Sequence, residues 1–550
     1  LSYFRWLFQI ISNAYLYNMN QFRYLLLLSL IYSQQMNVIP FDWSGQFGYV
    51  NNNGAIMWNQ DWESNQLLFD GTWSIYPRMY GPEIENGFGV ESNDTTNFDS
   101  SLVTSYFKYD QGDYLLDRFS MGSNYTEQKR KIHFHAFKRS YYGNFGQYNN
   151  ESNQPNQQSY ILAYESKKGN DVAGVSMGHF NTYSGIADSS SRGLVNNRIT
   201  SMNTFWNGSF GNFNSKIVLD QFLQRYQVNH SLSAFNSIRY LTRFRASGEL
   251  NWKDLITVGV KKNSRSVRID SLITIDWTRY YIKNDLSIFN IDMGLTNLNN
   301  KTNIDYTVEM KYRIKSFLLN AGIQKDVKPI HPYYLFRNYS ENISPISIIS
   351  NYYSGIEWTG NQTNASLNFV NLLDKNVYWE FVISDTTNYL WQESDHHQLN
   401  LNYKTSIIPF VDFEIKYATQ NSFNIYGGGI GYFLNYNIKS NLNLFDGFML
   451  VDLKLGVDRY INRLKNSIIH PIEMVPMTVY TRENLDDIAL FNGSITAYIS
   501  TFTIHFEWIN ITEMVLSSIG SEQNNFFEIH PEMPLMGRQT NFSVEWHFLD

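Results

Sequence analysis

Strict alternation of apolar and polar residues constrains the fold of this chain more than any other feature. In the segment 304–315 every even position is apolar or aromatic, and every odd position is charged or is Thr307. Successive side chains of a β-strand point to opposite faces, whereas a helix cannot separate these residues. The segments 411–417, 451–455 and 542–548 repeat the pattern. The sequence therefore predicts an all-β protein.

The candidate strands are long for a soluble domain. They run for about 10 residues, which suits a tilted membrane strand and is about twice the usual length in soluble proteins. Aromatic residues make up 16% of the chain, and they resemble the girdles that flank the lipid-facing band of a membrane barrel. Long polar segments such as 141–159 alternate with short turns such as Asn299-Asn300. We predict a closed antiparallel transmembrane β-barrel over residues 101–550, located in the outer membrane.

The length of this region sets the expected size of the barrel. About 30 residues for each strand and its connection predict about 16 strands, within a range of about 14–22. Side chains cannot fill a barrel of that diameter, so a water-filled lumen or a plug is expected.

Lipid fixes the orientation of the two strand faces. No water is present to hydrogen-bond the backbone, so the barrel must close and turn its apolar side chains outward. The charged positions then face the lumen, where rings of charge bias which ions pass. The alternative, in which these charges pair with one another on the inner wall without a role in selectivity, remains open. The pore-lining candidates are Asp305, Glu309, Lys311, Arg313, Asp412, Glu414, Lys416, Asp452 and Lys454.

The N-terminal region carries an export signal. The apolar run 24–33 is about half the length that a membrane-spanning helix needs. It follows a short segment, 19–23, with one positive charge and ends at the small residue Ser33. These features predict a signal peptide over 19–34, with residues 1–18 as a non-native upstream extension. The alternative is a buried N-terminal helix. We expect residues 35–100 to form a periplasmic or lumenal segment.

Composition excludes several classes of function. The formal net charge of −7 argues against nucleic-acid binding, which needs a basic surface. The absence of cysteine excludes disulfides, thiolate metal sites and cysteine nucleophiles. His133 and His135 share a strand face, but two ligands without a third make a weak metal site. With no catalytic motif either, we expect no cofactor, no metal and no enzymatic activity.

The last fifty residues carry a family resemblance. Asn510 ends the penultimate strand, and a connection with Pro534, Gly537 and Arg538 leads to a terminal aromatic strand. This arrangement resembles the last hairpin of TonB-dependent receptor barrels and of the plugless putative porins of Bacteroidetes-like bacteria. The chain departs from the family in having Leu535-Met536 where a proline usually precedes the glycine, and in continuing to Leu549-Asp550. The alternating residues of the terminal strand are Phe542, Val544, Trp546 and Phe548.

The resemblance implies a Gram-negative outer-membrane protein whose terminal strand is read by the barrel-insertion machinery. Full TonB-dependent receptors also carry an N-terminal plug of about 120–150 residues. Residues 35–100 are too few for such a plug and show no recognisable energy-coupling box, so an energy-coupling partner is doubtful. The expected function is passive passage of small solutes through a porin-like barrel.

Two other functions fit the same sequence. Alternation would also suit a secreted soluble β-protein that binds or cleaves glycans, with aromatic side chains as sugar platforms. A structural or adhesive barrel is the third possibility, with a lumen closed by side chains or by residues 40–100.

Overall fold

The computed structural model covers the 550 residues and describes most of the region from residue 102 onward. The described ranges are 102–140, 156–185, 194–229, 238–329 without 254 and 287, 346–383, 386–422 without 409, 432–462, 486–512 and 538–549. Five short strands before residue 87 are also described. Pro534, Gly537 and the expected signal peptide lie outside these ranges.

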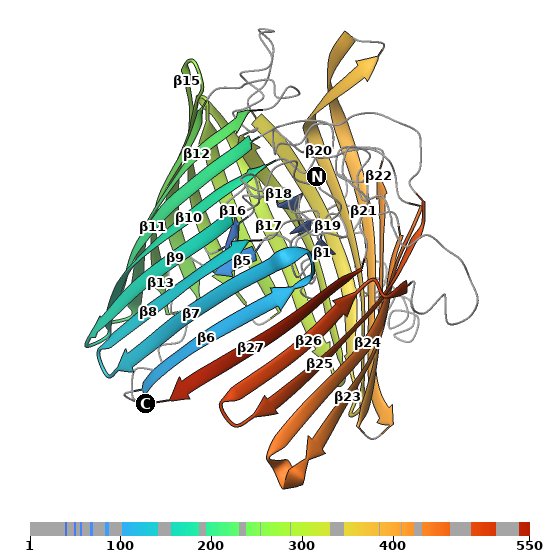
Figure 1. Ribbon diagram of the computed structural model, residues 1–550. Coiled ribbons are helices and arrows are strands. Elements are labelled where there is room, and N and C mark those ends of the chain that lie inside the picture. The colour runs from blue at the N-terminus through green and yellow to red at the C-terminus, as the bar shows by residue number, and fades with distance from the viewer. Residues whose placement is uncertain are drawn as a thin grey trace.

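The strands from residue 102 onward form a closed barrel, as the alternation predicts (Figure 1). Each strand pairs antiparallel with the next strand in the sequence, and the last strand, β27, pairs with the first, β6. The strands of the first half are β6 (Leu102–Gly112), β7 (Leu116–Glu127), β8 (Arg130–Ser140), β9 (Asn156–Lys168), β10 (Asp171–Gly185), β11 (Leu194–Phe210), β12 (Phe213–Asn229), β13 (Arg239–Trp252), β14 (Ile256–Arg268), β15 (Leu272–Asp285) and β16 (Phe289–Leu298).

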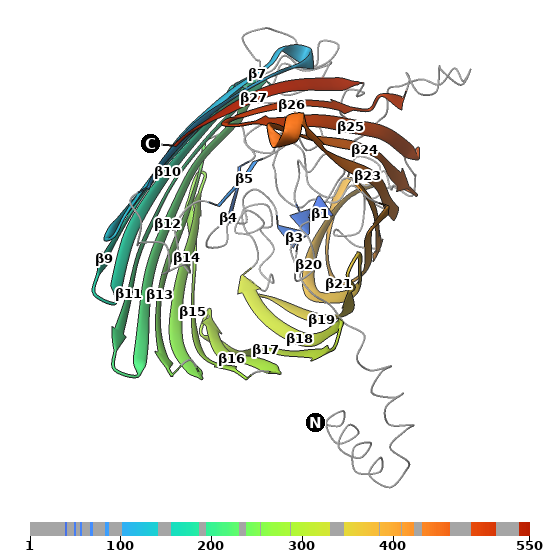
Figure 2. The same cartoon turned by 90° about the horizontal axis from the view of Figure 1, so that it is seen from below.

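The second half continues the same up-and-down order and returns to β6 (Figure 2). Its strands are β17 (Lys301–Ile314), β18 (Phe317–Pro329), β19 (Ile346–Thr359), β20 (Thr363–Ile383), β21 (Thr386–Ile408), β22 (Val411–Ser422), β23 (Tyr432–Leu444), β24 (Met449–Ile461), β25 (Ile488–Ile499), β26 (Phe502–Ile509) and β27 (Gln539–Leu549). Two short 3-10 helices, η2 (Asp113–Leu115) and η4 (Phe445–Gly447), lie in connections.

The barrel contains 22 strands, so the expectation of about 16 is wrong and the true number lies at the upper end of the expected range. The division by about 30 residues assumed connections that are too long. From Leu102 to Leu549 the chain spends about 20 residues on each strand with its connection. The physical reason is that the hairpin connections at one end of the barrel are very short.

The two ends of the barrel differ in their connections. At one end, the ten connections from β7–β8 to β25–β26 contain two to four residues each. At the other end they range from two residues to 29, between β26 and β27. The short hairpin between β16 and β17 turns through Asn299 and Asn300, both with positive φ (51° and 60°). Asparagine tolerates this conformation, which the favoured two-residue hairpin turn requires.

Five short strands precede the barrel in the sequence. In the view along the barrel, β1, β3, β4 and β5 lie within the outline of the ring (Figure 2). The strands are β1 (Ile39–Pro40), β2 (Tyr49–Val50), β3 (Ile56–Met57), β4 (Gln66–Phe69) and β5 (Glu83–Asn86).

The barrel is inside out relative to a soluble protein. Among the described residues, 25 buried side chains are polar or charged and 18 are apolar. Large apolar side chains are instead exposed, such as Ile304 at 58% and Leu455 at 57%. The concave face of a closed sheet crowds its side chains and the convex face spreads them, so the buried polar set lines the inner wall. Within the described residues, no helix is long and apolar enough to cross a bilayer.

The seam between β27 and β6 carries the aromatic residues of the terminal strand. Trp546 lies opposite Phe107 in the register, and its ring centroid is 4.6 Å from that of Phe502 and 4.5 Å from that of Phe548. Phe542 is exposed on the same outer face, and Val544 lies between Phe542 and Trp546 on that face. At the end of the seam where β6 ends and β27 begins, Asp113 Oδ2 accepts bonds from the backbone N–H (2.7 Å) and the hydroxyl (2.9 Å) of Thr540.

Candidate functional site: the inner wall

The structure places all nine nominated charged residues on the face of the sheet that forms the inner wall. Residues opposite each other in an antiparallel register share a face. Glu309 lies opposite Gly322, which lies opposite Tyr353, and the pairings continue from strand to strand around the barrel. The nine residues nevertheless do not form one ring. Four lie on β17, three on β22 and two on β24.

The inner face of β12 to β17, called the arginine sector below, concentrates buried positive charge. Three of its arginines lie at alternating positions of β13, and Arg265 on β14 lies directly opposite Arg243. Arg245 forms an ion pair with Asp220 on β12, whose carboxylate also accepts a bond from Asn203. The buried arginines are Arg239, Arg243, Arg245 and Arg265, each 6–8% exposed.

Arg279 on β15 is the centre of a second group in this sector. Its Nη2 lies 2.6 Å from Asp292 Oδ1, and its Nε lies 2.5 Å from Asp305 Oδ1. The second oxygen of Asp305 accepts a bond from the hydroxyl of Thr296 at 2.6 Å. One guanidinium thus bridges carboxylates from two neighbouring strands, the planar geometry that suits arginine. Asp305, nominated from sequence as a pore charge, is only 2% exposed.

Tyr281 and Glu249 extend the sector toward the short-turn end of the barrel. The Tyr281 hydroxyl donates to Glu249 Oε1 at 2.6 Å, and Lys283 Nζ lies 3.1 Å from the same oxygen. The Arg279 guanidinium and the Lys283 ammonium lie 4.9 and 4.7 Å from the Tyr281 ring centroid. The Tyr281 ring therefore lies between two cations, of which Lys283 is paired with Glu249 and Arg279 with Asp292 and Asp305.

The remaining nominated residues of β17 lie nearer the β17–β18 turn. Glu309 accepts a bond from the hydroxyl of Tyr353, and Lys311 Nζ lies 3.8 Å from its other oxygen. The Tyr353 ring lies directly over Gly322, where a Cβ would collide with it. Arg313 is exposed, one position before the strand ends.

The inner face of β20 to β25, called the amide sector below, is built differently. Asp458 accepts bonds from the side-chain amides of Asn435 (2.5 Å) and Asn492 (2.7 Å). The amide of Asn437 donates in turn to Asn435. The chain of bonds ends at Asn510, whose backbone N–H donates to Asn492 Oδ1 at 3.1 Å. Asn510 is buried with φ of 56°, so the motif asparagine terminates β26 and closes this network.

The nominated charges of β22 are compensated by neighbouring strands. Asp412 Oδ2 lies 2.9 Å from Lys404 Nζ, and its other oxygen accepts a bond from Ser406. Glu414 is bound on its two oxygens by Lys416 (3.1 Å) and Lys439 (3.0 Å). These pairs are partly exposed to the lumen.

The two nominated residues of β24 lie next to the same region. Asp452 lies opposite Asn441 and Thr496, and Lys454 lies opposite Lys439 and Ser494. Like-charged Lys454 and Lys439 are therefore direct cross-strand neighbours.

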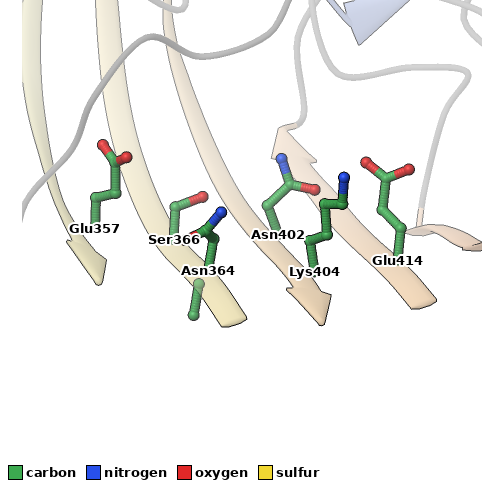
Figure 3. A pocket seen from close by; sticks show the side chains of 7 residues that line it. Glu357, Asn364, Ser366, Asn402, Lys404 and Glu414 are labelled. Atoms are coloured by element: carbon green, nitrogen blue, oxygen red, sulfur yellow. The ribbon is translucent and has the colours of Figure 1, made fainter. Parts of the chain in front are cut away.

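A pocket of about 290 Å³ lies on the inner face of β19 to β22 (Figure 3). Four adjacent strands contribute its lining, and the six side chains that are labelled point to one side of the sheet. The labelled residues are Glu357, Asn364, Ser366, Asn402, Lys404 and Glu414. Only Glu414 was nominated from the sequence.

Sequence reasoning missed Arg279, Tyr353 and the buried arginines of β13. Alternation within 239–245 contained the signal, because Arg239, Arg243 and Arg245 share one face. The partners of Arg279 lie one strand away (Asp292) and two strands away (Asp305), and nothing local in the sequence identifies them.

The two histidines that share a face have other partners. His133 bonds to Asn124, and His135 Nδ1 lies 2.5 Å from the Tyr106 hydroxyl. Among the described residues, no group of three or more His, Asp or Glu side chains is arranged to hold a metal.

Solved structures with the same fold are outer-membrane receptors and transporters. The FrpB iron transporter from Neisseria meningitidis matches with a TM-score of 0.62 at 9% identity, over 82% of this chain and 82% of that chain. The ferric enterobactin receptor PfeA from Pseudomonas aeruginosa matches with 0.61 at 11% identity, over 82% of both chains. The alcaligin outer-membrane receptor FauA from Bordetella pertussis matches with 0.53 at 10% identity, over 81% of this chain and 76% of that chain.

No family model and no curated protein matches the sequence. The structural likeness confirms the fold that the C-terminal residues resemble, that of a receptor barrel of the outer membrane. A closed barrel with an apolar exterior is the form in which strands cross such a membrane. The chain therefore has the fold of an outer-membrane β-barrel, and the solved structures that it matches are those of a transporter and of receptors.

Proposed function

We propose that this protein allows small solutes to cross the outer membrane through the barrel lumen. The observation that carries the proposal is the contrast between a polar, charged inner wall and an apolar outer face around a closed ring of 22 strands. Side chains from the wall alone cannot fill a barrel of this circumference. The charged pairs of β17 and β22 would then face passing solutes.

The route through the lumen depends on residues 35–100. We propose that this segment, which follows a signal peptide over 19–34, is lumenal or periplasmic and does not form a full plug. Passage would then be passive, without an energy-coupling partner. The C-terminal strand, with its outer aromatic residues, would be the signal for barrel insertion.

Conductance in planar lipid bilayers tests the proposal. Purified protein should produce discrete current steps in potassium chloride, and deletion of residues 35–100 should leave the steps equal or larger. A folded barrel that fractionates with outer membranes but passes no current would support the structural or adhesive alternative. A protein that stays soluble without detergent would support the secreted glycan-binding alternative instead.

A second candidate is uptake of an iron chelate. The fold likeness to an iron transporter and to a ferric enterobactin receptor favours it, and the buried arginines would suit an anionic chelate. Binding of ferric enterobactin to the detergent-solubilised protein, measured by fluorescence quenching, would favour this candidate over passive passage.

A further inference from the structure

The pocket on β19 to β22 has an unequal charge balance. Three of its lining side chains carry a charge, namely Glu357, Lys404 and Glu414. Lys404 is bound by Asp412 at 2.9 Å, outside the pocket lining. Glu414 is bound by Lys416 and Lys439, which also lie outside it. Two of the three charges are therefore already compensated.

Glu357 is the exception. Its carboxylate forms no ion pair and no hydrogen bond within the part of the chain that the structure describes. In the register it lies opposite Leu318 on one side and Ser366 on the other, neither of which carries charge. The pocket therefore retains one carboxylate that is open to a cationic ligand.

The rest of the lining consists of neutral hydrogen-bonding groups. Asn364 offers two donors and an acceptor, Asn402 offers the donors of its amide group because its Oδ1 is buried, and Ser366 offers a hydroxyl. Ser366 lies directly opposite Asn402, so these groups form a row across β20 and β21 beside Glu357. Figure 3 shows the amides and the hydroxyl on the same side of the sheet as both carboxylates. Such a row recognises hydroxyl groups and does not favour an apolar solute.

We propose that this pocket is a binding subsite for a small organic cation that carries hydroxyl groups, with its ammonium on Glu357 and its hydroxyls on Asn364, Ser366 and Asn402. The volume of about 290 Å³ suits a solute the size of one monosaccharide. A charge-assisted bond to a carboxylate is stronger than a neutral one, so Glu357 supplies most of the affinity. The inference deepens the proposed function, because passing solutes would contact this wall.

Glucosamine and glucose are the matched probes, since they differ by one ammonium group in place of a hydroxyl. Isothermal titration calorimetry of the full-length protein in detergent, at about pH 6 where the amine is protonated, measures both. Glucosamine should bind at least about tenfold more tightly than glucose, and Glu357→Gln should weaken glucosamine binding about tenfold. Glu545→Gln, an inner-wall carboxylate on β27 that pairs with His547, is the control and should bind as the wild type does.

Three results would overturn the inference. They are equal binding of glucose and glucosamine, unchanged glucosamine binding by Glu357→Gln, and no glucosamine binding by the wild type. The heat-dependent gel shift of each variant verifies that its barrel is folded. Asn402→Ala should weaken both sugars together, which separates the hydroxyl contacts from the charge.

Calorimetry in detergent does not need an open lumen, so the two proposals fail separately. Glucosamine binding without bilayer conductance would reject solute passage and keep the subsite. Conductance without glucosamine binding would reject the subsite and keep solute passage.

Discussion

The arginine sector and the amide sector are two parts of one inner wall, yet they hold their buried polar groups by different means. In the arginine sector, carboxylates such as Asp305 are buried against full positive charges. In the amide sector, Asp458 is buried to a similar extent and accepts bonds from the side-chain amides of Asn435 and Asn492. Alternation alone produced the same polar face in both places. The comparison shows that the free energy of unfolding lost on removal of a buried partner depends on which kind of partner the neighbouring strand supplies.

Removal of Arg279 should be the most damaging change. Arg279→Ala leaves Asp305 and Asp292 without the guanidinium that bridges them. Loss of one partner of a buried ion pair costs about 3–5 kcal/mol, and Asp305 is the buried partner. Reversible urea unfolding in lipid vesicles measures the loss. Adding Asp292→Asn and Asp305→Asn should recover part of it, and a triple variant no more stable than Arg279→Ala would contradict the explanation.

The matching change in the amide sector should cost less. Asp458→Asn keeps the shape of the side chain but turns one acceptor oxygen into a donor that faces Asn435 or Asn492. An unsatisfied buried hydrogen-bonding group costs about 1–3 kcal/mol. The same unfolding experiment should rank this variant between the wild type and Arg279→Ala. A loss as large as that of Arg279→Ala would erase the distinction between the two sectors.

The partly exposed pair on β21 and β22 should have a still smaller effect. Lys404 and Asp412 are joined at 2.9 Å, but 46% of the lysine side chain is accessible. Water screens such a pair, so Lys404→Gln should change the free energy of unfolding by less than about 1 kcal/mol. The pair Glu414–Lys416 provides the comparison through Lys416→Gln, for which we expect a change of similar size.

The smallest expected effect is a change in ion selectivity when two buried arginines are replaced. Arg243→Gln combined with Arg265→Gln removes two charges from the arginine sector, where the two arginine residues are 7% and 8% exposed. The ratio of anion to cation permeability should fall by about twofold. The zero-current potential across a bilayer under a salt gradient measures it. A shift toward anions would show that these arginines do not act on the permeating ions.

The sequence predicted the class of fold and the faces of the strands more accurately than their number. The segment 304–315 contains the information for its own face assignment, because side-chain direction has a period of two residues. Strand number depends on hairpin length, and turns such as Asn299-Asn300 are too short to stand out among many asparagines. The penultimate strand of the barrel, β26, ends at Ile509, directly before the motif residue Asn510.

The candidate site was less accessible to sequence reasoning. Asp305 was selected for its charge, but its environment depends on Arg279, which lies two strands away in the barrel. Glu357 stood in no strictly alternating segment and was not selected. Its lack of a partner became apparent only once β18 and β20 were placed beside it.

The seam described above has a consequence for biogenesis. Asp113 and Thr540 meet although they are 427 positions apart in the sequence, so ring closure brings together the first and last strands of the barrel. The entropy of closing a loop grows only slowly with its length, but the contact cannot exist until β27 has been synthesised. A nascent barrel must therefore keep the free backbone edge of β6 protected from aggregation until β27 arrives. The strand of the barrel that is synthesised last is the one that removes this hazard.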